Sequence, residues 1–107
     1  MEKLIKDVEQ WVIDKGIKDK ATTKTQWDKM SEEVSELKEA LIDLCNDDNH
    51  DNQYSAFLEL GDVVVTCIAM SMLLDTNIEQ VLQMAYDKIS KRTGRMINGT
   101  FVKSEDL

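Results

Sequence analysis

The feature that most constrains this sequence is a long apolar stretch, residues 54–74, that contains only two carboxylates. Its length and composition predict a helix that is buried around most of its circumference and is therefore central. The two carboxylates are Glu59 and Asp62, and a charge in apolar surroundings costs free energy unless a partner compensates it. No Lys or Arg lies in the stretch, so we expect the partner to come from another segment.

The preceding segment, 24–45, predicts a second long helix, because its apolar residues recur at alternating steps of three and four. Glu33 and Glu36 lie one turn apart at the edge of this apolar seam, and Glu32 points further toward solvent. The segment offers no obvious cation at the matching position. If the two helices pack side by side, four or five carboxylates converge, and that predicts a divalent cation. The seam consists of Trp27, Met30, Val34, Leu37, Leu41 and Leu44.

The whole chain of 107 residues is predicted to be one all-α domain, 1–107, built as a four-helix bundle. It contains no proline and four glycines, which favours helices joined by short polar turns over a sheet. Residues 17–23 are expected to be a polar connection. The helices are expected at about 2–15, 24–45, 54–74 and 78–91.

The last part of the chain, 92–107, is predicted to be a basic tail. Five basic residues and no acidic one occur in the segment 88–103, although the chain as a whole is acidic. Gly94 and Gly99 interrupt the helical pattern, so we expect a structured tail that is not helical.

The remaining metal-binding residue types predict no second metal site. The single histidine, His50, lies in the polar segment 46–53, which lacks the glycine and the final glutamate of an EF-hand and is expected to be a solvated turn. Cys45 and Cys67 have no CxxC spacing and are expected to be reduced core residues. Carboxylates without a nearby histidine favour Mg²⁺ or Mn²⁺ and argue against a ferritin-like di-iron site.

Charge and hydropathy narrow the expected partners. The formal net charge is −8, which argues against nucleic acid as a partner, because phosphate backbones bind to basic surfaces. The N-terminal segment lacks the features of a signal peptide. The longest uncharged run, 63–74, is shorter than the roughly 20 residues that span a bilayer. We therefore expect a cytoplasmic protein with no membrane partner.

The two acidic motifs, taken together, resemble those of the MazG-like family of all-α nucleoside triphosphate pyrophosphohydrolases. EExxE occurs in SEEVSELKEAL and ExxD follows in LELGDVVV on the next predicted helix. The resemblance covers residues 24–103, including the approach from Trp27 to Met30 and the basic C-terminal segment, and the chain is near the size of a single MazG-like domain. The resemblance implies hydrolysis of a (d)NTP between the α and β phosphorus, giving (d)NMP and pyrophosphate.

The resemblance also assigns roles to the acidic residues by their positions in the motifs. Glu33, Glu36, Glu59 and Asp62 would be the ligands of Mg²⁺, or of Mn²⁺ in its place. Glu32 and Glu33 would be the catalytic pair, with Glu32 as an outer ligand or as the group that orients the attacking water.

The nucleotide itself would be held by basic and aromatic side chains. Trp27 is expected either to stack on the base or to belong to the apolar core, and the same two interpretations apply to Trp11 and Tyr86. The basic residues are candidates for binding the phosphates, but a solvated tail or a dimer contact would account for them equally well. The candidates in the C-terminal segment are Lys88, Lys91, Arg92, Arg95, Asn98 and Lys103.

Two alternatives to this function stay open. One is a related phosphoanhydride hydrolase of the dUTPase-like or phosphoribosyl-ATP type. The other is a non-catalytic helical interaction protein, in which Glu59→Ala and Asp62→Ala would be tolerated. In each case a lone subunit would expose much of the apolar helix, so we expect a homodimer or a tetramer.

Overall fold

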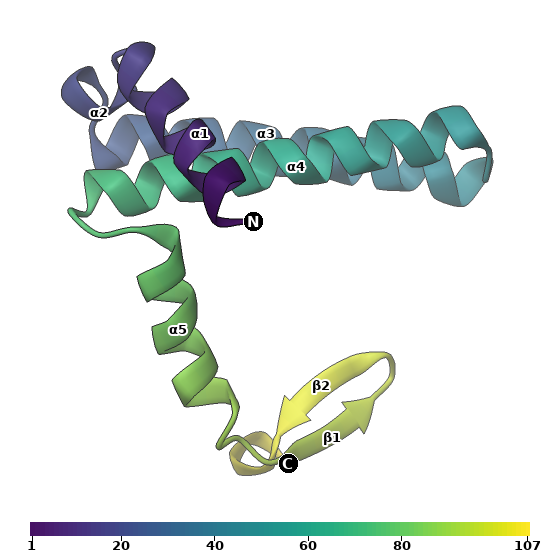
Figure 1. Ribbon diagram of the computed structural model, residues 1–107. Helices are drawn as coiled ribbons and strands as arrows, with labels where there is room; N and C mark the ends of the chain where they lie inside the picture. Colours follow the sequence, from purple (N-terminus) through teal and green to yellow (C-terminus); the bar gives the residue numbers. More distant parts are fainter.

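The computed structural model describes all residues, 1–107, and the chain is mostly helical, as expected. A two-stranded antiparallel sheet and one turn of 3₁₀-helix follow the helices (Figure 1). The helices are α1 (Glu2–Asp14), α2 (Ile17–Lys20), α3 (Thr23–Asn46), α4 (His50–Leu73) and α5 (Ile78–Ile89), the strands are β1 (Gly94–Ile97) and β2 (Thr100–Lys103), and the 3₁₀ turn is Ser104–Asp106.

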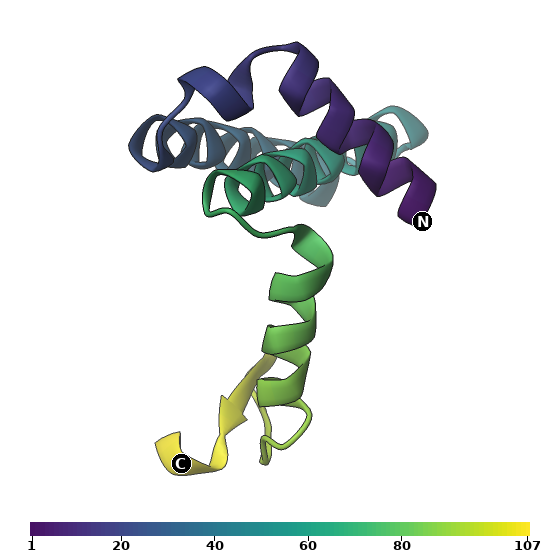
Figure 2. The ribbon, with the colours of Figure 1, turned by 60° about the vertical axis from the view of Figure 1, so that its left-hand side comes forward.

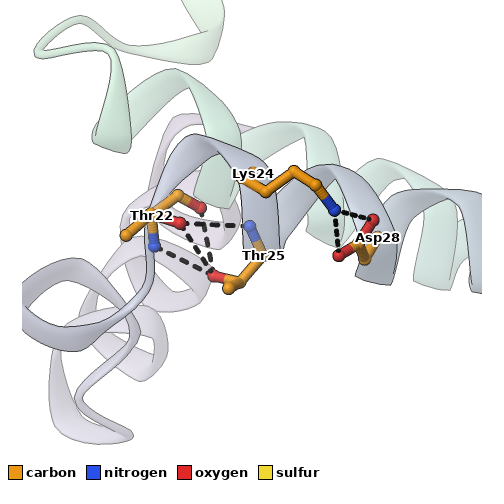
Figure 3. Close-up of polar contacts among 4 residues, drawn as sticks. All are labelled: Thr22, Lys24, Thr25 and Asp28. Carbon is orange, nitrogen blue, oxygen red and sulfur yellow. Dashed lines mark hydrogen bonds and ion pairs between the residues drawn. The ribbon is translucent and has the colours of Figure 1, made fainter.

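The frame of the molecule is the antiparallel pair of α3 and α4, which lie side by side along their lengths (Figure 1, Figure 2). Helix α3 begins with a capping box: the Thr22 hydroxyl accepts from the Thr25 amide at 3.1 Å, and the Thr25 hydroxyl accepts from the Thr22 amide at 2.9 Å (Figure 3). An exposed Lys24–Asp28 ion pair at 2.8 Å follows on the first turn (Figure 3). The predicted turn at 46–53 is shorter than expected, because Asn49 caps α4 and the helix already starts at His50.

Helix α1 crosses α4 obliquely and supplies the centre of a small core (Figure 2). Val12 is completely buried against Ile68, Ala69 and Met72 of α4. The expected polar connection at 17–23 contains the short helix α2. Its Lys18 ammonium donates to the Met72 carbonyl at 2.7 Å and so ties this connection to the end of α4.

Helix α5 leaves the α3–α4 pair after a turn in which Asp75 has a positive φ of 59°. In both views α5 carries the β-hairpin away from the paired helices (Figure 1, Figure 2). The expected helix to residue 91 is slightly too long, because α5 ends at Ile89. The expectation of a structured tail that is not helical is confirmed, since β1 pairs with β2. Asn98 and Gly99 form the two-residue hairpin turn, both with positive φ, as a type I′ turn requires.

Helix α4 is central, since α1, α2, α3 and α5 all contact it, but it is not buried all round. Within one chain only ten residues are buried, and the apolar face of α4 that includes Phe57, 68% exposed, is open. The predicted core positions Trp27 and Cys45 are exposed as well. The expectation of all-round burial is therefore wrong for the single chain.

By length and composition alone, α4 could cross a membrane. The core helix of a soluble protein meets the same criterion, and α4 packs along α3 and under α1. The cytoplasmic location therefore stays a prediction.

The complete burial of Val12 leads to a prediction about the free energy of unfolding. We expect Val12→Ala to lower the free energy of unfolding by roughly 2 kcal/mol, because it leaves a cavity under α1. The neighbouring Ile13→Ala removes more atoms but from a half-exposed side chain, and it should cost less. Urea unfolding of both variants measures the difference, and a larger loss for Ile13→Ala would contradict this account of the core.

Candidate metal centre

Three of the predicted acidic residues converge between α3 and α4. Glu33, Glu59 and Asp62 each offer a carboxylate oxygen, and these oxygens lie within 4.8 Å of one another. Glu59 and Asp62 share a face of α4, one turn apart. The antiparallel helices place Glu33 opposite them, because it lies at a similar distance along the chain from the connecting turn.

Burial makes this cluster unusual among acidic groups. Glu33 is only 8% exposed, and its Oε2 has no hydrogen-bond donor; the Oε2 of Glu59 is equally buried and equally without a donor. Nearly all buried polar groups in folded proteins have a partner, and a carboxylate oxygen without one is costly. Asp62 is exposed and opens the cluster to solvent. Two buried carboxylate oxygens without a donor, on residues whose carboxylates converge, fit a cation.

One cation already lies at the edge of the cluster. The Lys29 ammonium is 3.0 Å from Oε1 of Glu33 and 3.8 Å from Glu32. The expectation that this helix supplies no cation at the matching position is therefore wrong. The hydrogen bond to Glu33 is the main reason that the pKa of Lys29 is raised above 10.5. Lys29 nevertheless satisfies only one of the two Glu33 oxygens.

Glu36, the fourth predicted ligand, lies beside the cluster and is not one of the three converging groups. It is exposed, but repulsion from Glu33 raises the pKa of the Glu36 carboxyl above its usual 4.5, and Glu59 adds to the effect. Glu32 is exposed, and its carboxylate lies 3.8 Å from the Lys29 ammonium. The structure thus separates the predicted set into three converging carboxylates, one charged neighbour and one outer residue.

The basic residues form a second cluster at the end of α5 and the root of the hairpin. Lys88, Lys91, Arg92 and Lys103 line an open cavity of about 670 Å³. Arg95 is on β1, Asn98 is in the hairpin turn, and neither lines this cavity. Because α5 leads away from the paired helices, the chain does not bring this cluster to its own carboxylates (Figure 1).

The aromatic residue near the carboxylates is Trp11 and not the predicted Trp27. Trp11 lines a cavity together with Glu33 and Asp62, whereas Trp27 is 58% exposed and does not. Gln26 lines the same cavity and was not singled out from the sequence, where a lone glutamine before an apolar seam carries no signal.

No protein-family model, curated protein or solved structure matches this chain. The chemistry of the centre must therefore be judged from its donor set. Three hard carboxylate oxygens, without histidine or cysteine in the group, suit Mg²⁺ or Mn²⁺ better than zinc or copper.

Repulsion at Glu36 predicts a pH-dependent stability. Since its folded-state pKa lies above 4.5, the folded protein binds this proton more tightly, and stability in the absence of metal falls as the pH rises through that range. Glu36→Gln should therefore raise the melting temperature in EDTA near neutral pH and lose this advantage at about pH 4. Thermal unfolding followed by circular dichroism measures both, with Glu39→Gln as the matched control on the next turn. A stabilisation that persists unchanged at low pH would rule out repulsion as the cause.

Proposed function

We propose that this protein is a Mg²⁺-dependent nucleoside triphosphate pyrophosphohydrolase that converts a (d)NTP and water into (d)NMP and pyrophosphate. The observation that carries the proposal is the pair of buried carboxylate oxygens, on Glu33 and Glu59, that have no partner in the chain. The resemblance of the EExxE and ExxD motifs to those of MazG-like enzymes supports the same reaction.

In this proposal Glu33, Glu59 and Asp62 hold the cation, and Glu36 adds negative charge beside them. A bound Mg²⁺ would neutralise triphosphate charge and lower the pKa of a coordinated water. Glu32 orients the attacking water from the solvent side of the centre. Lys29 balances the charge of Glu33.

We also propose that the working unit is a homodimer or a tetramer, a bundle of the all-α NTP pyrophosphatase type that a second copy completes. The chain exposes 8131 Å², whereas a compact protein of 12.3 kDa exposes about 6,100 Å². Its radius of gyration is 16.5 Å, against about 13 Å for a compact domain of this length. Burying the excess of roughly 2,000 Å² on each copy gives an interface of the size seen in obligate dimers.

A second copy would also account for the basic cluster. Within one chain the cluster of Lys88, Lys91, Arg92 and Lys103 lies away from the carboxylates, so it serves the phosphates only if it faces the centre of another copy.

The exposed apolar faces favour one competing function, a non-catalytic interaction protein. That function needs no cation, and it leaves the two buried carboxylate oxygens unexplained. A related phosphoanhydride hydrolase would use the same carboxylates and differs only in its substrate.

The reaction is tested by pyrophosphate release from a panel of NTPs and dNTPs, with Mg²⁺ and with EDTA. We expect release that depends on Mg²⁺ and that falls at least roughly 100-fold in Glu59→Gln and Asp62→Asn, because each removes a charge from the cation site. Glu39→Gln, an exposed glutamate on α3, is the control and should keep full activity. Equal activity in all three variants would exclude the centre as the site of reaction.

The assembly is tested by light scattering after size-exclusion chromatography. We expect a mass of two or four times 12.3 kDa. Phe57→Glu, on the exposed apolar face of α4, should shift the protein toward monomer, while Lys3→Glu on α1 should not. A stable monomer for the unmodified protein would refute the proposed assembly.

A further inference from the structure

The β-hairpin formed by β1 and β2 lacks a packing surface within the chain. The two strands contact each other and the 3₁₀ turn, and no helix packs extensively against either of them. A lone two-stranded hairpin is only marginally stable in water. A hairpin of this size therefore gains stability from a surface on which it can dock.

One face of the hairpin is apolar and open. Met96 and Phe101 are cross-strand partners, so their side chains share this face, and they are 64% and 47% exposed. The Phe101 ring lies over Gly94, where a Cβ would collide with the ring and with the Val102 carbonyl. This contact fixes the ring on its own hairpin and still leaves the face uncovered.

A groove that suits this face lies among α1, α4 and α5. It has a volume of about 600 Å³, and its lining is mainly apolar. Phe57, Leu58 and Leu82 line it, and each of these side chains is more than half exposed. The groove is thus open to solvent and large enough to take the side chains of Met96 and Phe101.

The charges of the two surfaces are complementary. The ionisable residues that line the groove are Asp62 and Glu79, and both are acidic. The strands of the hairpin carry Arg95 and Lys103 and no acidic residue. Opposite charges steer two surfaces together and select the surfaces that meet.

The direction of α5 keeps the hairpin away from the groove of its own chain. Ile78, Glu79 and Leu82, at the start of α5, line the groove, whereas the hairpin follows the end of this helix. A helix of 12 residues is about 18 Å long, so the helix separates the two surfaces (Figure 1). Only the hairpin of another copy can reach the groove.

An antiparallel pair of α5 helices would bring the two surfaces together. If two copies are related by a two-fold axis along this pair, the hairpin of each copy reaches the start of the other α5. No residue of α5 is buried within one chain. Leu82, Tyr86 and Ile89 form an exposed apolar stripe on α5, at the spacing of one helix face, that such a pair would cover.

We propose that the β-hairpin of one copy docks in the groove of a second copy, with Met96 and Phe101 against the apolar wall that includes Phe57. The two-fold axis makes the contact reciprocal, so each dimer contains it twice. The inference rests on the proposed homo-oligomer and names the surfaces that form it. Because Asp62 lines the groove and belongs to the carboxylate centre, the docked hairpin lies beside that centre.

Two variants test the contact from its two sides. Met96→Glu places a carboxylate on the apolar face of the hairpin, and Phe57→Glu places one in the groove. By light scattering we expect each variant alone to be a monomer near 12.3 kDa, with its helices intact by circular dichroism. Thr100→Glu, exposed on the opposite face of the hairpin, is the matched control and should keep the mass of the unmodified protein.

A mixing experiment separates this contact from other ways of forming a dimer. An equimolar mixture of Met96→Glu and Phe57→Glu can form a pair with one intact hairpin in one intact groove, so we expect part of the dimer mass to return. A mixture of Met96→Glu with the double variant that carries both substitutions has no intact hairpin and should stay monomeric. No gain of mass in the first mixture, or an unchanged mass for Met96→Glu alone, would overturn the proposed contact.

Amide hydrogen exchange gives a second readout. We expect the strand amides of residues 94–103 to exchange at least roughly tenfold faster in Phe57→Glu than in the unmodified protein, because an undocked hairpin opens readily. Lys3→Glu, on the exposed side of α1, should leave their exchange unchanged. Equally fast exchange in the unmodified protein and in Phe57→Glu would contradict docking.

These outcomes are distinct from those of the proposed reaction. An oligomer whose mixed variants do not recover mass would refute the hairpin contact alone. A monomeric unmodified protein would refute both the assembly and the contact, whatever its activity. Recovery of mass without pyrophosphate release from the unmodified protein would support the contact and refute the reaction.

Discussion

The close packing of α3 against α4 is the constraint on which the rest of the structure depends. Small buried residues, Ala40 on α3 and Ala56 on α4, accompany this close approach. The approach excludes water from Glu33 and places it opposite Glu59 and Asp62. Helix α4 also carries the core around Val12, so the helix that positions the carboxylates is also the one that anchors α1. The fold and the carboxylate centre therefore both depend on α4.

The packing of α3 against α4 brings carboxylates of like charge close together in the folded protein. Like charges at close range destabilise the fold in the absence of a cation, and the raised pKa of Glu36 is the local sign of that repulsion. Lys29 offsets part of it from the exposed edge, where an ion pair contributes little. An acidic centre that is costly when empty and is compensated by a bound cation is what a metal-dependent site requires.

Much of the centre could be predicted from the sequence, because Glu59 and Asp62 are the only carboxylates in a long apolar segment, although Asp62 proves to be exposed. Lys29 could have been found too, since it precedes Glu33 by four residues, the usual spacing of a helical ion pair. The hairpin also had a signal, Asn98–Gly99 between short apolar runs, which the basic character of the segment obscured. Gln26 had none, because its role depends on a carbonyl forty residues away in the chain.

The error about α4 has a different origin. Apolar composition shows that a surface must be covered, but it does not show which chain covers it. Phe57 and its neighbours are exposed because no segment of the chain covers them, and α5 leads away from the paired helices after Asp75. The same turn carries Lys88 and Arg92 away from the carboxylates. The direction of α5 thus leaves the apolar face of α4 uncovered and keeps the basic cluster away from the carboxylates. In the proposed homo-oligomer, a second copy of the chain would cover this face and bring a basic cluster to the carboxylates.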